Sequence, residues 1–127
     1  MPSPTYPFSS PRKGDGTVMV TEILVDAGSC KFKTRITVGK LDGKLRVETV
    51  SSCEKVRLWA EKLGSEVEAL SLTKPFCSNP AYLAADEPAR LCPPCPVPTA
   101  FLMAAWAEAG YLIKRNPSIG FREAGRP

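Results

Sequence analysis

The sequence contains no histidine among its 127 residues. Histidine is the side chain that most readily acts as a general base near neutral pH, and it is the commonest metal ligand. Its absence excludes nucleophiles that depend on a Ser–His or Cys–His pair. No other acid–base pair accompanies a nucleophile in the sequence, so we expect that the chain alone is not an enzyme.

Long hydrophobic runs are absent as well. The longest apolar window, residues 99–113, is interrupted by Glu108 and Gly110, whereas a membrane-spanning helix needs about 20 apolar residues. Residues 1–16 contain no apolar run of the kind that defines a secretory signal. We therefore expect a cytoplasmic protein with no membrane partner.

Basic residues are in only slight excess, with a net charge of +4. Much of this excess lies in residues 114–127, which contain Lys114, Arg115, Arg122 and Arg126. The rest of the chain is close to neutral, whereas a nucleic-acid-binding domain usually has a basic face. We therefore expect a protein partner or a larger enzyme complex, and no nucleic acid.

Composition divides the chain into three parts. Proline, serine and glycine dominate residues 1–16, and such a segment cannot bury a core. We predict a disordered N-terminal arm over 1–16, one metal-binding domain over 17–113 and a basic C-terminal tail over 114–127. The middle part has the length of a single small domain.

Alternation of apolar and polar residues with period two runs over residues 17–50. It is typical of strands with one buried face, and it places Phe32 on the buried face and Arg35 on the solvated one. Asp42-Gly43 is a strong signal for a two-residue hairpin turn. These patterns predict a three-stranded antiparallel meander.

The periodicity becomes helical after this meander. Capping boxes at residues 51–54 and 65–68 predict two helix starts, with Ser51 as the first N-cap. Asn79 followed by proline predicts a third start, and the last helix is expected from about Pro98. The predicted fold class is α+β, with the meander followed by several helices packed on one face.

The five cysteines lie at chain reversals and helix starts. An odd number of cysteines without an export signal argues against a disulfide framework. The N-terminal turn of a helix offers free N–H groups and a positive dipole end, and both favour the thiolate that binds iron or zinc. Plain packing of small buried thiols is the alternative. The residues are Cys30, Cys53, Cys77, Cys92 and Cys95.

Cys92 and Cys95 form a CxxC motif whose two intervening residues are prolines. Such a motif commonly contributes two thiolates to one cluster or zinc ion, and it also occurs in thiol-redox proteins. We predict that the metal ligands are Cys30, Cys53, Cys92 and Cys95. Cys77 is the alternative to Cys92 as the fourth ligand, and no cofactor-binding residue is predicted beyond these ligands.

The order of elements resembles the iron–sulfur cluster scaffold domain of the IscU, SufU and NifU type. The resemblance covers roughly 17–113 and is carried by three segments that contain cysteines, together with the short segment Ser65–Leu70. It reinforces the prediction, made from their shared placement at chain reversals and helix starts, that Cys30, Cys53 and Cys95 are obligatory ligands. The three segments are Ala27-Gly28-Ser29-Cys30, Val50-Ser51-Ser52-Cys53 and Cys92-Pro93-Pro94-Cys95.

Two departures from the scaffold pattern point to a cluster that stays bound. The scaffold family has an aspartate just after its first cysteine, where this chain has Lys31, and its Leu-Pro-Pro-Val-Lys chaperone motif is missing. We therefore expect an iron–sulfur protein, with a 4Fe–4S cluster favoured and 2Fe–2S possible. It would serve a larger enzyme as an electron-transfer or accessory module or as a cluster carrier. The alternatives are a structural zinc domain for protein contacts and a CxxC thiol-redox protein.

Overall fold

The strands predicted over residues 17–50 are present in the computed structural model, which describes residues 20–125. The predicted arm at 1–16 lies outside the described residues. Asp42 and Gly43 have φ values of 50° and 79°, as a two-residue hairpin turn requires, so that prediction is confirmed. The antiparallel strands are β1 (Val20–Asp26), β2 (Lys33–Leu41) and β3 (Lys44–Ser51).

A fourth strand, β4 (Glu66–Glu68), pairs antiparallel with the start of β3, and the sheet order is β1-β2-β3-β4. We predicted a helix start at 65–68, and that prediction is wrong. Long-range pairing decides the outcome, because the Ser65 carbonyl accepts the Val47 N–H at 2.8 Å. The two glutamates of β4 also lie opposite basic residues of β3, an arrangement that stabilises antiparallel pairs.

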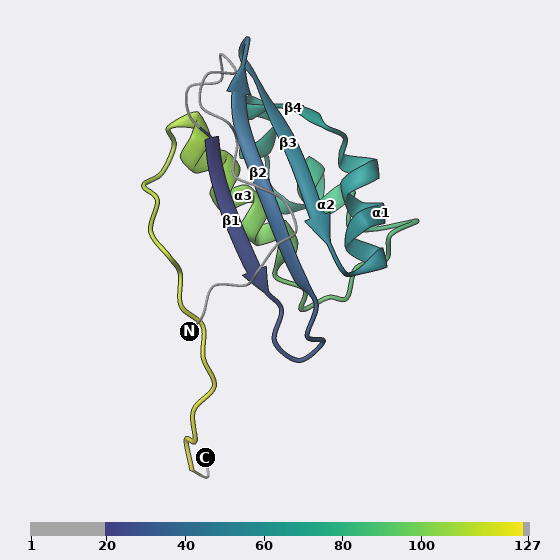
Figure 1. Cartoon of the computed structure of the whole chain (residues 1–127), viewed down its shortest axis with the longest axis vertical. Coiled ribbons are helices and arrows are strands. Elements are labelled where there is room, and N and C mark those ends of the chain that lie inside the picture. The colour runs from purple at the N-terminus through teal and green to yellow at the C-terminus, as the bar shows by residue number, and fades with distance from the viewer. Residues whose placement is uncertain (1–19, 126–127) are drawn as a thin grey trace.

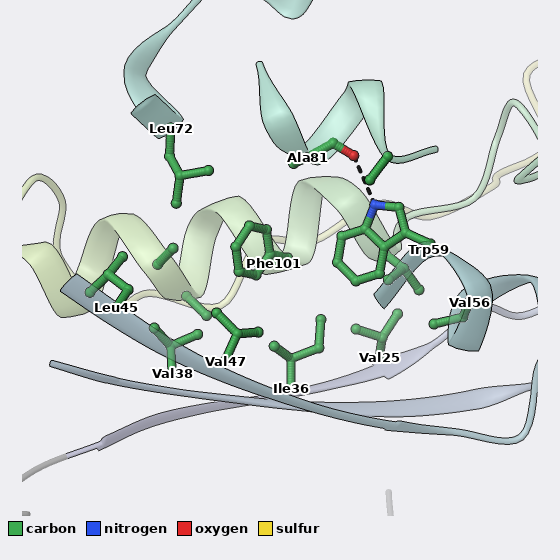
Figure 2. Packing of buried hydrophobic residues seen from close by; sticks show 14 of the residues in the cluster. Val25, Ile36, Val38, Leu45, Val47, Val56, Trp59, Leu72, Ala81 and Phe101 are labelled. Carbon is green, nitrogen blue, oxygen red and sulfur yellow. Dashed lines mark hydrogen bonds between the residues drawn. The ribbon is translucent and has the colours of Figure 1, made fainter. Parts of the chain in front are cut away.

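The helices lie on one face of the sheet, with α3 behind β1 and β2 and α1 beside β3 (Figure 1). Figure 2 shows the same arrangement from the side, with the sheet below and the helices above the core. The predicted α+β class is confirmed. The helices are α1 (Glu54–Leu63), α2 (Pro80–Leu83) and α3 (Val97–Ala109), with 3-10 turns η1 (Ala69–Thr73) and η2 (Phe76–Ser78).

The core lies between the sheet and the helices, and its centre is aromatic. Trp59 of α1 and Phe101 of α3 are fully buried and meet edge to face, with ring centroids 5.6 Å apart. The Trp59 Nε1–H donates to the Ala81 carbonyl at 2.8 Å and so ties α1 to α2 (Figure 2). The aliphatic residues of the sheet that pack beneath them include Ile36, Val38, Leu45 and Val47.

The start of α1 also differs from the prediction. Ser51 is the last residue of β3 rather than the N-cap of α1, and its hydroxyl accepts the Cys53 N–H at 3.0 Å. Cys53 itself is the N-cap residue. The start of α2 is as predicted, with the Asn79 side chain accepting the Ala81 N–H at 3.0 Å. The junction therefore places a cysteine directly at the first turn of α1.

Two side chains of the meander are exposed or buried contrary to prediction. Phe32 lies in the β1–β2 connection, outside the strand, and is 42% exposed. Arg35 points away from the helices, yet it is only 6% exposed and its Nη1 lies 3.2 Å from Glu22 Oε2. A guanidinium next to a cross-strand carboxylate can be buried because its charge is paired.

The chain leaves α3 at Gly110, whose φ of 89° ends the helix in the left-handed conformation. Residues 113–125 are exposed and contain no helix or strand. They run as an extended segment past the sheet and beyond its lower end (Figure 1). None of the helices among the described residues is long and apolar enough to cross a membrane.

Candidate metal centre

Three connections that contain cysteines lie toward one end of the sheet (Figure 1). They are the β1–β2 connection, the β3–α1 junction and the segment that precedes α3. The first two are held together by reciprocal bonds. The Lys33 N–H donates to Ser52 Oγ at 3.1 Å, and the Ser52 N–H donates to the Lys33 carbonyl at 3.2 Å. Antiparallel register therefore brings residues 19 apart in sequence to the same place.

Cys30 is exposed in the β1–β2 connection. The loop is closed by a bond from the Lys31 N–H to the Gly28 carbonyl at 2.9 Å, and both residues have positive φ. Asp26 supports the turn by accepting the Gly28 N–H at 2.9 Å and the Lys33 ammonium at 2.7 Å. The lysine bond, with help from the Gly28 N–H, lowers the pKa of Asp26 below its ordinary value.

Cys53 is half-buried at the N-terminus of α1 and packs against the core. Its carbonyl accepts the Arg57 N–H at 3.1 Å, the first bond of the helix. It therefore lies at the positive end of the dipole of α1. The placement that we predicted from sequence, at a helix start, is confirmed for this residue.

The CxxC motif forms a tight turn in front of α3. The Cys95 N–H donates to the Cys92 carbonyl at 2.9 Å, and α3 begins two residues later at Val97. Cys92 is exposed, whereas Cys95 is half-buried and packs against the core. The Lys55 ammonium of α1 lies 3.9 Å from the Cys92 sulfur, so the CxxC turn lies against the start of α1.

The Cys95 thiol interacts electrostatically with three other cysteines. Burial is the main cause that raises its pKa, and the Val97 N–H, which donates to the Cys95 thiol, opposes this effect. Charges on Cys53, Cys30 and Cys92 raise the pKa of Cys95 further. These three are the other ligands predicted from the sequence, and each lies within electrostatic range of the Cys95 thiol.

Cys77 lies elsewhere. It is exposed in η2, a turn of its own, and it is not among the thiols that shift the pKa of Cys95. The surroundings of Cys95 therefore favour Cys92 over Cys77 as the fourth predicted ligand.

The arrangement of the four predicted ligands is not yet that of a metal site. Within residues 20–125, no three acidic or cysteine side chains are grouped so that they could hold a metal ion as they stand. Cys30 and Cys92 are exposed on turns, where side chains change rotamer easily. A metal would therefore have to draw these two side chains inward toward Cys53 and Cys95.

Lys55 is the residue at this site that the sequence did not identify. It lies two positions after Cys53, but in sequence it is simply one of several charged residues on an exposed helix face. Only the packing of the CxxC turn against α1 gives it a sulfur to contact. Its ammonium places a positive charge beside the Cys92 sulfur.

Comparisons with curated proteins and with solved structures found no match. The resemblance to cluster scaffold domains therefore stays a prediction. A protein-family model described as a family of unknown function (DUF6951) matches residues 21–121. Since that match spans all five cysteines and nearly all of the described residues, the chain belongs to this family of unknown function.

Proposed function

We propose that Cys30, Cys53, Cys92 and Cys95 bind an iron–sulfur cluster, with a 4Fe–4S cluster favoured over 2Fe–2S. The observation that carries this proposal is the meeting of three separate connections, each with its cysteine, at one end of the sheet. Packing alone does not explain it, because two of the four side chains are exposed.

The chemistry of the site suits an anionic cluster. Four thiolates are the usual ligands of such clusters, and N–H groups directed at sulfur set their reduction potential. The Val97 N–H bonds to the Cys95 sulfur, and the dipole of α1 ends at Cys53. The Lys55 ammonium beside Cys92 adds positive charge. These groups would offset the negative charge that four thiolates bring together.

The role that follows is that of an electron-transfer or accessory module, or a cluster carrier, for a larger enzyme. A bound cluster would supply one-electron chemistry to that enzyme. We expect the partner to be a protein and the location to be the cytoplasm, where thiols remain reduced. A structural zinc ion is the alternative cargo, since zinc also accepts four thiolates in tetrahedral geometry.

One observation favours a second candidate, dithiol–disulfide exchange at the CxxC motif. Cys92 is exposed and close to Lys55, whereas Cys95 is half-buried behind it. In that reaction the two thiols would pass two electrons and two protons to a disulfide of a partner protein. They would end as a Cys92–Cys95 disulfide, and the partner would end as two thiols.

The test is the metal content of the full chain purified without oxygen. We expect iron and acid-labile sulfide in about fourfold ratio to protein, the stoichiometry of a 4Fe–4S cluster, together with an electron paramagnetic resonance signal after reduction. Cys53→Ser should lose most of this iron, and Cys77→Ser is the matched control that should keep it. Stoichiometric zinc without iron would contradict the cluster and show that the protein is a structural zinc domain. A metal-free protein with a reversible Cys92–Cys95 disulfide would establish the exchange reaction instead.

A further inference from the structure

The segment that follows α3 begins against β1 and ends in solvent. Residues 114–117 line a groove together with residues 21–23 of β1 and with side chains of α3. From there the segment runs in the same direction as β1 and passes the end of the sheet where the cysteine-containing connections lie (Figure 1). Residues 118–125 are all exposed. The first part of the segment is therefore anchored beside β1, and the remainder is not.

The part that is not anchored contains two large apolar side chains. Ile119 is 98% exposed and Phe121 is fully exposed. Gly120 separates them, so in an extended backbone they point to the same side, and large apolar groups exposed together mark interaction sites. The family match ends at residue 121, so it includes both side chains. We refer to residues 118–121 as the strap.

The edge of β1 beside the anchored residues can receive a strand. Among the described strands β1 pairs only with β2, and its other edge has no neighbouring strand. Edges of this kind readily accept an added strand. Leu24 of β1 and Phe32 of the β1–β2 connection are each 42% exposed. This end of the β1 edge therefore offers apolar contacts as well as backbone groups.

The anchored residues determine where the strap would lie on that edge. Two extended chains that run in parallel advance by about 3.3 Å per residue and stay in step. With residues 114–117 beside residues 21–23, Ile119 reaches the level of Val25 and Phe121 reaches the level of Ala27. The Ala27 N–H donates to the Phe32 carbonyl at 3.2 Å. Phe121 would therefore arrive at the start of the connection that contains the exposed thiol of Cys30.

We propose that the strap closes along the β1 edge of its own chain as a parallel strand, with Phe121 packed against Phe32 and screening Cys30. Pro117 has no N–H to donate, so strand pairing begins after it. The short tether selects the same chain over a second copy, because a segment joined by a few residues has an effective concentration in the millimolar range. The structure shows the strap open. Closure acts at the same end of the sheet as the proposed metal centre, but it does not depend on a metal.

The experiment follows alkylation of Cys30 by iodoacetamide in the full chain, reduced and free of metal, with peptide mapping. A thiol beneath the strap reacts only in the open state, and the minor state of such an equilibrium is about 10% populated or less. Ile119→Asp/Phe121→Asp should therefore raise the Cys30 rate about tenfold or more. The rate at Cys77, exposed on η2, should not change. Leu70→Asp, at a residue 73% exposed on η1, is the matched control and should behave like the wild-type protein.

Hydrogen exchange on the same proteins identifies the receiving surface. Amides of β1 should exchange faster in the double variant than in the wild-type protein, amides of β3 should be unchanged, and both proteins should sediment as monomers of 13.7 kDa. Equal Cys30 rates in the two proteins would overturn the proposal, and so would equal exchange in β1. Protection of β1 that appears only as the wild-type chain dimerises would also overturn it, because a second copy would then supply the strap. The iron content that tests the proposed function is measured separately, so either proposal can fail without the other.

Discussion

The two tryptophans test how strongly burial determines the contribution of a hydrogen bond to the free energy of unfolding. Both indole N–H groups donate to backbone carbonyls, Trp59 to Ala81 at 2.8 Å and Trp106 to Leu72 at 3.0 Å. Trp59 is fully buried, whereas Trp106 is only partly buried. The same substitution, Trp→Phe, removes the N–H in each case and keeps an aromatic ring. The difference between the two variants therefore isolates the environment.

For Trp59→Phe the structure indicates a large loss of stability. The Ala81 carbonyl, in a residue with no exposed surface, loses the Trp59 bond, and an unsatisfied buried acceptor costs about 1–3 kcal/mol. The smaller ring leaves a cavity that costs about 1 kcal/mol more. The total of about 2–4 kcal/mol corresponds to a fall in Tm of roughly 10–20 °C for a domain of this size.

For Trp106→Phe the expected loss is smaller, about 1 kcal/mol. The Leu72 carbonyl keeps a second donor, the Asn79 side-chain amide at 2.9 Å, and the ring of Trp106 is only partly buried. Urea denaturation of both variants, followed by circular dichroism in metal-free buffer, gives the two free energies of unfolding. Equal losses, or a larger loss for Trp106→Phe, would show that the burial argument does not hold here.

Three further predictions concern the cysteine end of the sheet. If the proposed cluster is bound, Lys55→Ala should keep it but make it harder to reduce, because a positive charge beside Cys92 favours the more negative reduced state. Redox titration with Lys55→Arg as control measures this. The lowered pKa of Asp26 means that its contribution to stability is present above its ordinary pKa and is lost as pH falls through the folded value. The free energy of unfolding should therefore fall less steeply with decreasing pH in Asp26→Asn than in the wild-type protein. Identical curves for the two proteins would show that Asp26 does not stabilise the turn. In metal-free protein, Cys95 should react with iodoacetamide at pH 8 more slowly than Cys77, since burial raises the pKa of Cys95; peptide mapping by mass spectrometry would reveal the opposite order.

Local signals predicted local structure well. Asp42-Gly43 determines its hairpin through the backbone preferences of those two residues, and Asn79 begins α2 through its own side chain. The helix expected from about Pro98 begins at Val97. In each case the deciding interactions lie within a few residues, so the sequence pattern contains them.

Non-local interactions decided the features that sequence reasoning missed. Residues 65–68 carry a capping-box pattern, but pairing with β3 outweighs it. The alternation pattern predicts that Arg35 is solvated, yet the residue is buried because its charge is paired with Glu22 on the neighbouring strand. The candidate site shows the same division, since the position of each cysteine at a turn or helix start was predictable, whereas the contact of Lys55 with Cys92 depends on how α1 packs.

The junction between β3 and α1 has a consequence for folding. Ser51 pairs with Thr34 in the sheet, and Cys53 begins the helix only two residues later, so no flexible linker separates strand pairing from the position of the thiol. A slip of β3 by one residue would turn its side chains to the opposite face and carry Cys53 away from Cys30. A ligand that needs both sulfurs would bind only the correctly paired sheet and stabilise it by mass action. The same atoms that hold a metal would then select the native strand register.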